Sequence, residues 1–431
     1  MRTWHLLLIA LILWIPSAWV PPPTRQQELR VLISARNMLE SGNFHRPEFQ
    51  NQPRFRKPPM AYWIAAAGMG ISGQTQQAWA GRFLFLLCSM AALWLLIQIS
   101  GPAGIHTGLI AVFSFGLWRY APLAETDLIQ VMGILLFMYA WKQQSGLLAG
   151  LGISFACLSK GPAGLIIPLI CMLFLFRVYR PRPKFLWTTL GIPLLLIGGW
   201  ILFLINQESG LTQMQSDLTA TFVDSAHRNP WYYYFYTLPL LMLPLGLLVC
   251  LPQRKKAQNA SLETRTAWVW FAVTFILLTL TVSKQRHYAL LLLPSAAWLI
   301  GMRLHSRSLP KTIWPLSAAI LISIASVASQ WQSEDRQNAL FLQKVSPYVQ
   351  SVDTVHVVGI NSAIFDFQLG RHVENTDSLE NALARANPGD AIVVIQKNTT
   401  PLPALLPVRQ ADNEVWTRRF YIKETSPDLD R

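Results

Sequence analysis

Ionisable side chains stand beside apolar runs in five separate segments of this 431-residue chain. Charged groups next to a membrane are costly unless they are paired or hydrated, so their positions mark candidates for function. Two prolines after Lys57 fix an extended bend, which can hold this lysine toward a phosphate group. The side chains concerned are Glu28, Arg30, Arg56, Lys57, Glu125, Asp127, Lys160, His227, Arg228, Lys284, Arg286 and His287.

An alternative interpretation is that these side chains only make the connecting loops polar. It explains less, because the loops are short and their charges adjoin apolar sequence, as in LAETDLIQ (123–130) and LSKGPAGL (158–165). We therefore expect Arg30, Lys57, Asp127 and His227 to converge around one cavity that faces outward from the membrane, since reacting groups must approach closely.

The composition indicates that membrane-spanning helices position these residues. Charged side chains make up 13% of the chain, whereas soluble domains usually carry about 25%. Hydrophobic residues make up 52%. The apolar runs predict about eleven transmembrane helices. They cover residues 3–20, 79–99, 103–120, 126–141, 145–159, 161–177, 185–205, 232–251, 266–283, 287–302 and 312–330.

Basic residues in the short loops predict how these spans are oriented. With a cytoplasmic N-terminus, the inner loops receive most of the lysines and arginines, as the positive-inside rule requires. Most of the net charge of +14 then sets orientation and does not indicate a nucleic-acid partner. The candidate residues fall at the outer, periplasmic face. The inner residues are Lys142, Arg177, Arg180, Arg182, Lys184, Arg254, Lys255, Lys256, Arg303, Arg307 and Lys311.

The parts outside the spans are predicted to fold at that outer face. In the first periplasmic loop (21–78), Leu29, Leu32 and Met38 lie broadly along one face of an amphipathic helix that ends at Ser41-Gly42. Residues 60–73 are apolar but too short to cross, which favours a helix near the interface.

The last hundred residues differ in composition from the rest of the chain. Strands are predicted at 354–360 and 391–395, and a helix at 378–386. The predicted fold is a polytopic α-helical membrane protein with two domains. These are a transmembrane domain (1–330) and a small soluble α/β domain in the periplasm (331–431).

Six motifs in order along the first 300 residues carry a family resemblance. They are ELRVLISARNMLESGNF (28–44), FRKPPMAYW (55–63), AETD (124–127), SKGPAGLIIP (159–168), HRNPWYYY (227–234) and SKQRHYALLLLP (283–294). The chain resembles the C-type membrane glycosyltransferases of the protein O-mannosyltransferase and 4-amino-4-deoxy-L-arabinose lipid A transferase superfamily. The resemblance implies an inner-membrane protein, a periplasmic site and a donor sugar on undecaprenyl phosphate.

Two positions depart from the family pattern. The family's Asp-Glu-x-Arg reads Gln27-Glu28-Leu29-Arg30, and its Glu-Lys-Pro-Pro reads Arg56-Lys57-Pro58-Pro59. In relatives that second Glu and a loop His, here His227, can hold a divalent metal. With Arg56 in place of the Glu, a conventional metal site is doubtful. A divalent metal therefore stays an open alternative, with His227 as its candidate ligand, and no cofactor is certain.

The resemblance implies roles for the residues that are retained. Departure of a phosphate needs positive charge, and a hydroxyl acceptor needs a general base, which Gln27 cannot provide. The base is Asp127 or Glu28, or is dispensable if the acceptor is already an anion. Catalytic roles are predicted for Asp127, Glu28 and Lys57; phosphate binding for Arg30, Arg56, Lys57, His227 and Lys284; and a lipid or sugar groove for Tyr232, Tyr233 and Tyr288, which could equally be interfacial anchors.

The main hypothesis is therefore transfer of a sugar from a polyprenyl-phosphate donor to lipid A or another envelope lipid or glycan. The rival is a non-catalytic descendant that binds polyprenyl phosphate or lipid A as an accessory protein, which Gln27 and Arg56 favour. A transporter fits less well, because transporter sites lie at the membrane midplane.

Overall fold

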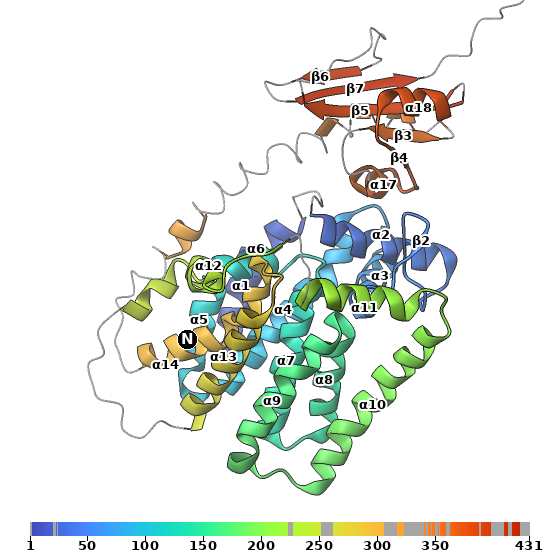
Figure 1. The fold of residues 1–431 in the computed structure, drawn as a ribbon. Coiled ribbons are helices and arrows are strands. Elements are labelled where there is room, and N and C mark those ends of the chain that lie inside the picture. The colour runs from blue at the N-terminus through green and yellow to red at the C-terminus, as the bar shows by residue number, and fades with distance from the viewer. Residues whose placement is uncertain are drawn as a thin grey trace, which may run out of the picture.

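The computed structural model contains a helical body and a C-terminal sheet, with a layer of short helices between them (Figure 1). The described residues are 2–19, 23, 25–222, 227–250, 262–305, 317–322, 340–341, 344–345, 347–349, 352, 354–358, 363–387, 389–397, 409–412 and 416–422.

The helical body has an apolar core to which most of its helices contribute, including Trp14, Phe137 and Trp270. Three segments predicted as single spans are divided. The helices of the body are α1 (Thr3–Trp19), α4 (Ala78–Ile99), α5 (Gly104–Val112), α6 (Phe115–Tyr120), α7 (Thr126–Gln143), α8 (Gly146–Lys160), α9 (Pro162–Tyr179), α10 (Pro183–Ile205), α12 (Tyr233–Leu241), α13 (Leu262–Leu280) and α14 (Leu293–His305), with 3-10 turns η1 (Gly101–Ala103), η2 (Leu245–Cys250) and η3 (Arg286–Leu291).

Local polar chemistry explains two of the divisions. The span predicted at 103–120 breaks because the Ser114 hydroxyl accepts the Leu117 N–H and starts a new helix, α6. The span predicted at 232–251 breaks after Leu241, before Pro244, which has no N–H to donate. The Phe115 N–H at the first break donates to the Leu243 carbonyl at the second break, at 2.8 Å. Each break therefore supplies a hydrogen-bond partner for a backbone group of the other.

The predicted number of spans is not confirmed. Among the described residues, two helices are long and apolar enough to cross a membrane by length and composition, α4 and α10. The span predicted at 287–302 corresponds to η3 followed by α14. Most of the span predicted at 312–330 lies outside the described residues.

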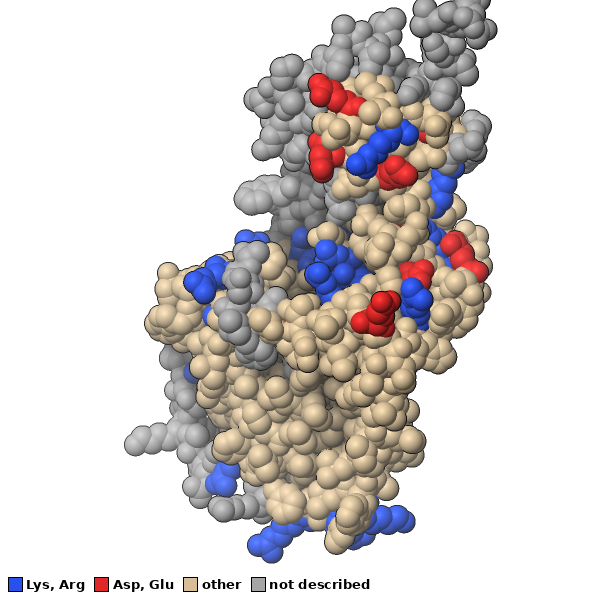
Figure 2. All heavy atoms as spheres, turned by 45° about the vertical axis from the view of Figure 1, so that its right-hand side comes forward, with Lys and Arg blue, Asp and Glu red and all other residues tan. Residues whose placement is uncertain are grey.

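The surface pattern agrees with a body that sits in a membrane. On the described part of the face in Figure 2, the middle of the body is free of charged side chains, and Lys and Arg gather at its far end. The turn between α9 and α10, with Arg180, Arg182 and Lys184, lies at the end opposite the C-terminal sheet (Figure 1). This is the arrangement expected from the positive-inside rule.

Helices α7 and α8 pack with their backbones nearly in contact. A Cβ atom at Gly133 would lie 2.5 Å from the Ala156 amide nitrogen, and one at Gly152 would lie 2.6 Å from the Phe137 amide nitrogen. The bare glycines therefore set how closely the two helices, which carry Asp127 and Lys160 at one end, approach each other.

Substitution of Gly133 by alanine is expected to destabilise the protein by about 1–3 kcal/mol, because backbone atoms must move to admit the methyl group. Thermal unfolding in detergent measures the effect. Gly199→Ala in α10 is the matched control, since a Cβ there meets nothing within 4 Å. Equal stability of the two variants would contradict the close packing of α7 and α8.

The layer between body and sheet contains the helices predicted in the first loop. Helix α2 (Gln26–Ser41) ends at Gly42, which has a left-handed φ of 69°, and α3 (Met60–Ser72) follows the β1–β2 hairpin. A further amphipathic helix, α11 (Gly210–Phe222), was not predicted. Figure 1 shows α2, α3 and α11 across one end of the body.

Helix α2 differs from the predicted surface helix in its burial. Val31, Ile33 and Arg36 are buried as well as the predicted face, because α17 (Ala363–Leu369) of the C-terminal unit packs on the opposite side. Helix α2 is therefore covered by the C-terminal unit as well as by α3, which the amphipathic pattern alone did not predict.

The C-terminal unit is an α/β fold, as predicted. Its five strands run in the order β4-β3-β5-β7-β6, with β3 parallel to β4 and β5 and the other pairs antiparallel. The predicted strands and helix correspond to β3 (Val355–Val358), β5 (Ala391–Lys397) and α18 (Leu379–Arg385), which Ser378 caps. The strands β4 (Glu374–Thr376), β6 (Arg409–Asp412) and β7 (Trp416–Ile422) were not predicted.

Candidate functional site

Lys57 is held by α11. Its Nζ donates to Asp217 Oδ2 at 2.7 Å, and both side chains are about one quarter exposed. The preceding chain is fixed by Gln213, whose side-chain oxygen accepts the Phe55 N–H at 2.8 Å and whose Nε2 donates to the Pro53 carbonyl at 3.1 Å. Helix α11, which was not predicted, therefore holds Lys57 and the chain before it at a defined place.

Three arginines gather beside this lysine. Arg30 and Arg54 both lie over the Phe49 ring, each with its guanidinium carbon 6.0 Å from the ring centroid. The pKa of Arg30 is lowered to about 10, first by burial and then by the charges of Arg54 and Arg56. Like charges placed together repel one another, so the cluster is stabilised by an anion.

A second group of side chains surrounds Asp127 at the start of α7. Its carboxylate, 1% exposed, forms an ion pair with Lys160 at the end of α8. His287 Nε2 lies 3.9 Å from the other carboxylate oxygen, and Lys160 Nζ lies 4.0 Å from the centroid of the Tyr288 ring. Asp127 is therefore a buried carboxylate whose negative charge is held by a neighbouring lysine.

The two groups of side chains are adjacent. The charge of Lys57 is close enough to act on Asp127, His287 and Tyr288. The charge of Asp217, which binds Lys57, also acts on Arg30. Lys57 is thus within electrostatic reach of Asp127, and Arg30 within reach of Asp217, the partner of Lys57. That these residues and His227 converge around one cavity stays a prediction.

Glu28 does not have the geometry of a catalytic base. Arg82 binds it with two hydrogen bonds, from Nε to Oε1 at 2.7 Å and from Nη2 to Oε2 at 2.8 Å. Oε1 also accepts the Ala124 N–H at 3.2 Å, and both charged side chains are 1% exposed. Both oxygens are engaged away from solvent, which argues against the catalytic role predicted for Glu28.

Two other predicted residues, His227 and Lys284, lie where residues 227–229 pair with residues 283–284. His227 is exposed and its carbonyl accepts the Lys284 N–H at 3.0 Å. The Lys284 side chain is buried and its Nζ donates to the Thr281 carbonyl in the same loop, which does not fit phosphate binding. Tyr232 is 50% exposed, as an interfacial anchor would be, whereas Tyr233 is buried against Tyr234.

The described residues do not fit a divalent metal at the position that the family resemblance implies. Among them, no group of three or more His, Cys, Asp or Glu could hold an ion. Arg56 stands where the resemblance implies an acidic ligand, and Arg30 and Arg54 add positive charge around it. A cation would therefore be repelled from this place.

Sequence reasoning missed several residues of the site. Arg54 and Asp217 were not singled out, and Arg82 was not recognised as the partner of Glu28. Lys160 and His287 were noted as charges at the membrane face, and the structure places both beside Asp127. The helix that carries Asp217 could have been predicted, because the spacing of Leu211, Met214 and Leu218 is typical of an amphipathic helix.

Comparison with known proteins gives consistent matches. Residues 56–203 match the family described as dolichyl-phosphate-mannose-protein mannosyltransferase. An uncharacterized protein of Aquifex aeolicus is 27% identical over 316 residues, which are 68% of this chain and 61% of that protein. Undecaprenyl phosphate-alpha-4-amino-4-deoxy-L-arabinose arabinosyl transferase 1 of Sodalis glossinidius is 26% identical over 269 residues, 53% of this chain and 44% of that enzyme.

A solved structure shares the fold. The crystal structure of ArnT from Cupriavidus metallidurans bound to undecaprenyl phosphate matches with a TM-score of 0.74 and 14% identity, over 96% of this chain and 97% of that one. In sequence, the matched region spans less than two thirds of both relatives named above. Part of the chain is therefore similar in sequence to the dolichyl-phosphate-mannose-protein mannosyltransferases and to the arabinosyl transferases, and the whole chain is similar in fold to ArnT.

Proposed function

We propose that this protein transfers a sugar from a polyprenyl-phosphate donor to an envelope lipid or glycan, with lipid A as the first candidate acceptor. The single observation that carries the proposal is the constellation of Arg30, Arg54, Arg56 and Lys57 beside the buried Asp127. A cluster of cations next to a carboxylate suits a reaction in which a phosphate departs and a hydroxyl loses its proton.

The reaction requires that the bond between the sugar's anomeric carbon and the phosphate oxygen breaks. The bonding electrons leave with the phosphate, and Lys57 with the neighbouring arginines stabilises the charge that develops there. The acceptor oxygen bonds to the anomeric carbon. If that oxygen belongs to a hydroxyl, Asp127 takes its proton; if it belongs to a phosphate anion, no proton is transferred and Asp127 orients the acceptor.

The proposed location is the bacterial inner membrane with the site facing the periplasm. The basic turn between α9 and α10 at the opposite end of the body supports this orientation. The relatives support the donor class, because the Sodalis enzyme is named for an undecaprenyl phosphate sugar and the Cupriavidus structure contains undecaprenyl phosphate. Membrane lipids surround the body, and the charge distribution gives no reason to expect nucleic acid.

Binding of undecaprenyl phosphate tests the donor site directly. Lys57→Ala is expected to weaken binding by about 10- to 100-fold, because a charge-assisted hydrogen bond contributes about 1.5–3 kcal/mol. Titration of the purified protein in detergent, followed by tryptophan fluorescence, measures the change. Lys142→Ala is the control, since it removes the same charge from the exposed opposite end of α7. Wild-type affinity in Lys57→Ala would refute the proposed phosphate site.

The non-catalytic alternative rests on Gln27, which stands at the second position of α2 in place of the acidic residue. An accessory protein would bind undecaprenyl phosphate through the same cations but would transfer no sugar. Mass spectrometry of envelope lipids and glycans from a deletion strain separates the two functions. A lost sugar mass, restored by the wild-type gene, supports the enzyme; an unchanged profile supports the accessory protein.

A further inference from the structure

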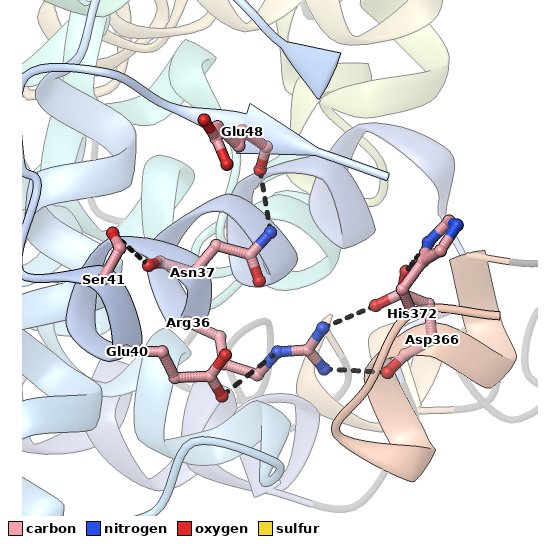
Figure 3. A network of polar contacts seen from close by, with 7 residues as sticks. All are labelled: Arg36, Asn37, Glu40, Ser41, Glu48, Asp366 and His372. Carbon is pink, nitrogen blue, oxygen red and sulfur yellow. Dashed lines mark hydrogen bonds and ion pairs between the residues drawn. The ribbon is translucent and has the colours of Figure 1, made fainter. Parts of the chain in front are cut away.

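A polar cavity of about 370 Å³ lies where the first loop meets the C-terminal unit. Its walls come from α2, from the β1–β2 hairpin (Glu48–Phe49 and Gln52–Pro53) and from α17 with the residues that follow it. Figure 3 shows the Asn37 side chain directed at the Glu48 carbonyl and the Arg36 side chain directed at Asp366. Its lining includes Asn37, Glu40, Ser41, Glu48, Arg371 and His372.

A buried ion pair fixes the two sides of the cavity to each other. Arg36 Nη2 lies 2.5 Å from Asp366 Oδ1, and Nη1 donates to the Asp366 carbonyl at 2.8 Å. The side chains of Arg36 and Asp366 are 3% and 2% exposed. His372 Nδ1 lies 3.4 Å from the second carboxylate oxygen of Asp366 (Figure 3). The Arg36–Asp366 pair therefore fixes the α2 wall of the cavity to the α17 wall.

The lining selects the chemistry of a ligand. Every described residue that lines the cavity has a polar side chain, which does not suit an acyl chain, since lipid and drug pockets are mainly apolar. Three carboxylates face two arginines there, so the cavity carries no excess positive charge and does not suit a phosphate. Side-chain amides, carboxylates and a histidine can donate and accept hydrogen bonds with the hydroxyl and amino groups of a sugar.

The cavity is close to the donor site. Arg30 and Asn37 are seven residues apart on α2, so they lie on one helix face at a separation of about 10 Å along the axis. The hairpin joins the two places as well, because Phe49 lies under Arg30 and Arg54 while the neighbouring Glu48 lines the cavity. A carbohydrate bound in the cavity is thus within a short distance of the phosphate-binding cations.

We propose that this cavity, hereafter the junction cavity, binds the carbohydrate part of the acceptor, as a hydroxyl- or amino-bearing sugar unit. The proposal rests on the proposed glycosyl transfer and extends it to the acceptor. The C-terminal unit then has a function in catalysis, because it supplies half of the acceptor site and holds it against α2 through Arg36 and Asp366.

The test uses the full chain in lipid nanodiscs and a soluble glucosamine disaccharide as the probe, with binding followed by saturation-transfer NMR. Glu48→Ala and His372→Ala are each expected to weaken binding of the disaccharide by about tenfold, the effect of losing hydrogen bonds in the cavity. Both side chains are at least one third exposed, so the fold tolerates their removal. Glu380→Ala on the outer surface of α18 is the matched control and is expected to bind as the wild type does.

A second series replaces the disaccharide by vesicles that contain lipid A. Weaker binding of both probes to Glu48→Ala identifies the sugar of a lipid acceptor, and weaker binding of the disaccharide alone identifies a free glycan. Wild-type binding of both probes to Glu48→Ala and His372→Ala overturns the proposal. Undecaprenyl phosphate binding is expected to stay unchanged in these variants and to weaken in Lys57→Ala, so failure of the donor site is recognised separately.

Discussion

Asp127→Asn is expected to lower sugar transfer by at least about 100-fold, the lower limit of what a positioned proton acceptor contributes. The Asp127 carboxylate is 1% exposed, is paired with Lys160 and is within reach of the charge of Lys57. Because it is buried, a water molecule cannot replace it as the proton acceptor. The measurement is the product formed in a single turnover from an undecaprenyl-phosphate sugar, detected by mass spectrometry. Affinity for undecaprenyl phosphate should change far less, because the cations bind the phosphate.

The substitution also leaves Lys160 buried beside a neutral amide. Loss of one partner from a buried ion pair costs about 3–5 kcal/mol of stability, so a loss of activity could reflect unfolding. The double variant Asp127→Asn/Lys160→Met removes the stranded charge and is expected to regain thermal stability without regaining transfer. If the double variant transfers sugar at the wild-type rate, or if the single variant is folded and fully active, Asp127 is not catalytic.

Local patterns in the sequence predicted the parts of the site that depend on local chemistry. The end of α2 at Gly42 followed from the Ser-Gly pair. Strands β3 and β5 followed from β-branched runs. In each case the signal and its structural consequence lie within a few residues of each other.

The partners of these residues could not be predicted in the same way. Lys57 pairs with Asp217, 160 residues further along the chain, and Arg36 pairs with Asp366, 330 residues further. Such pairs depend on how helices pack, and sequence spacing carries no information about that packing. The burial of both sides of α2 was missed for the same reason, since the pattern of a single helix does not show which element covers its other face.

Glu28→Gln is expected to destabilise the protein by about 3–5 kcal/mol, because it leaves Arg82 buried without its charged partner. The pair joins the start of α2 to α4, and Arg82 also donates to the Ala18 carbonyl of α1 at 3.2 Å. Its loss therefore releases the helix that carries Arg30 from the membrane body. Thermal unfolding in detergent measures the loss, with Glu40→Gln on the exposed last turn of the same helix as the control.

The double variant Glu28→Leu/Arg82→Met decides between a structural and a catalytic role. Two apolar side chains of similar size remove both charges at once, and such replacements of buried ion pairs are often neutral or stabilising. If Glu28 only anchors α2, the double variant regains stability and transfers sugar at close to the wild-type rate. If the double variant is stable but inactive, Glu28 takes part in the reaction, and the closed geometry with Arg82 must open when the substrate binds. The first result is expected, because both carboxylate oxygens already accept hydrogen bonds from Arg82 and one also accepts the Ala124 N–H.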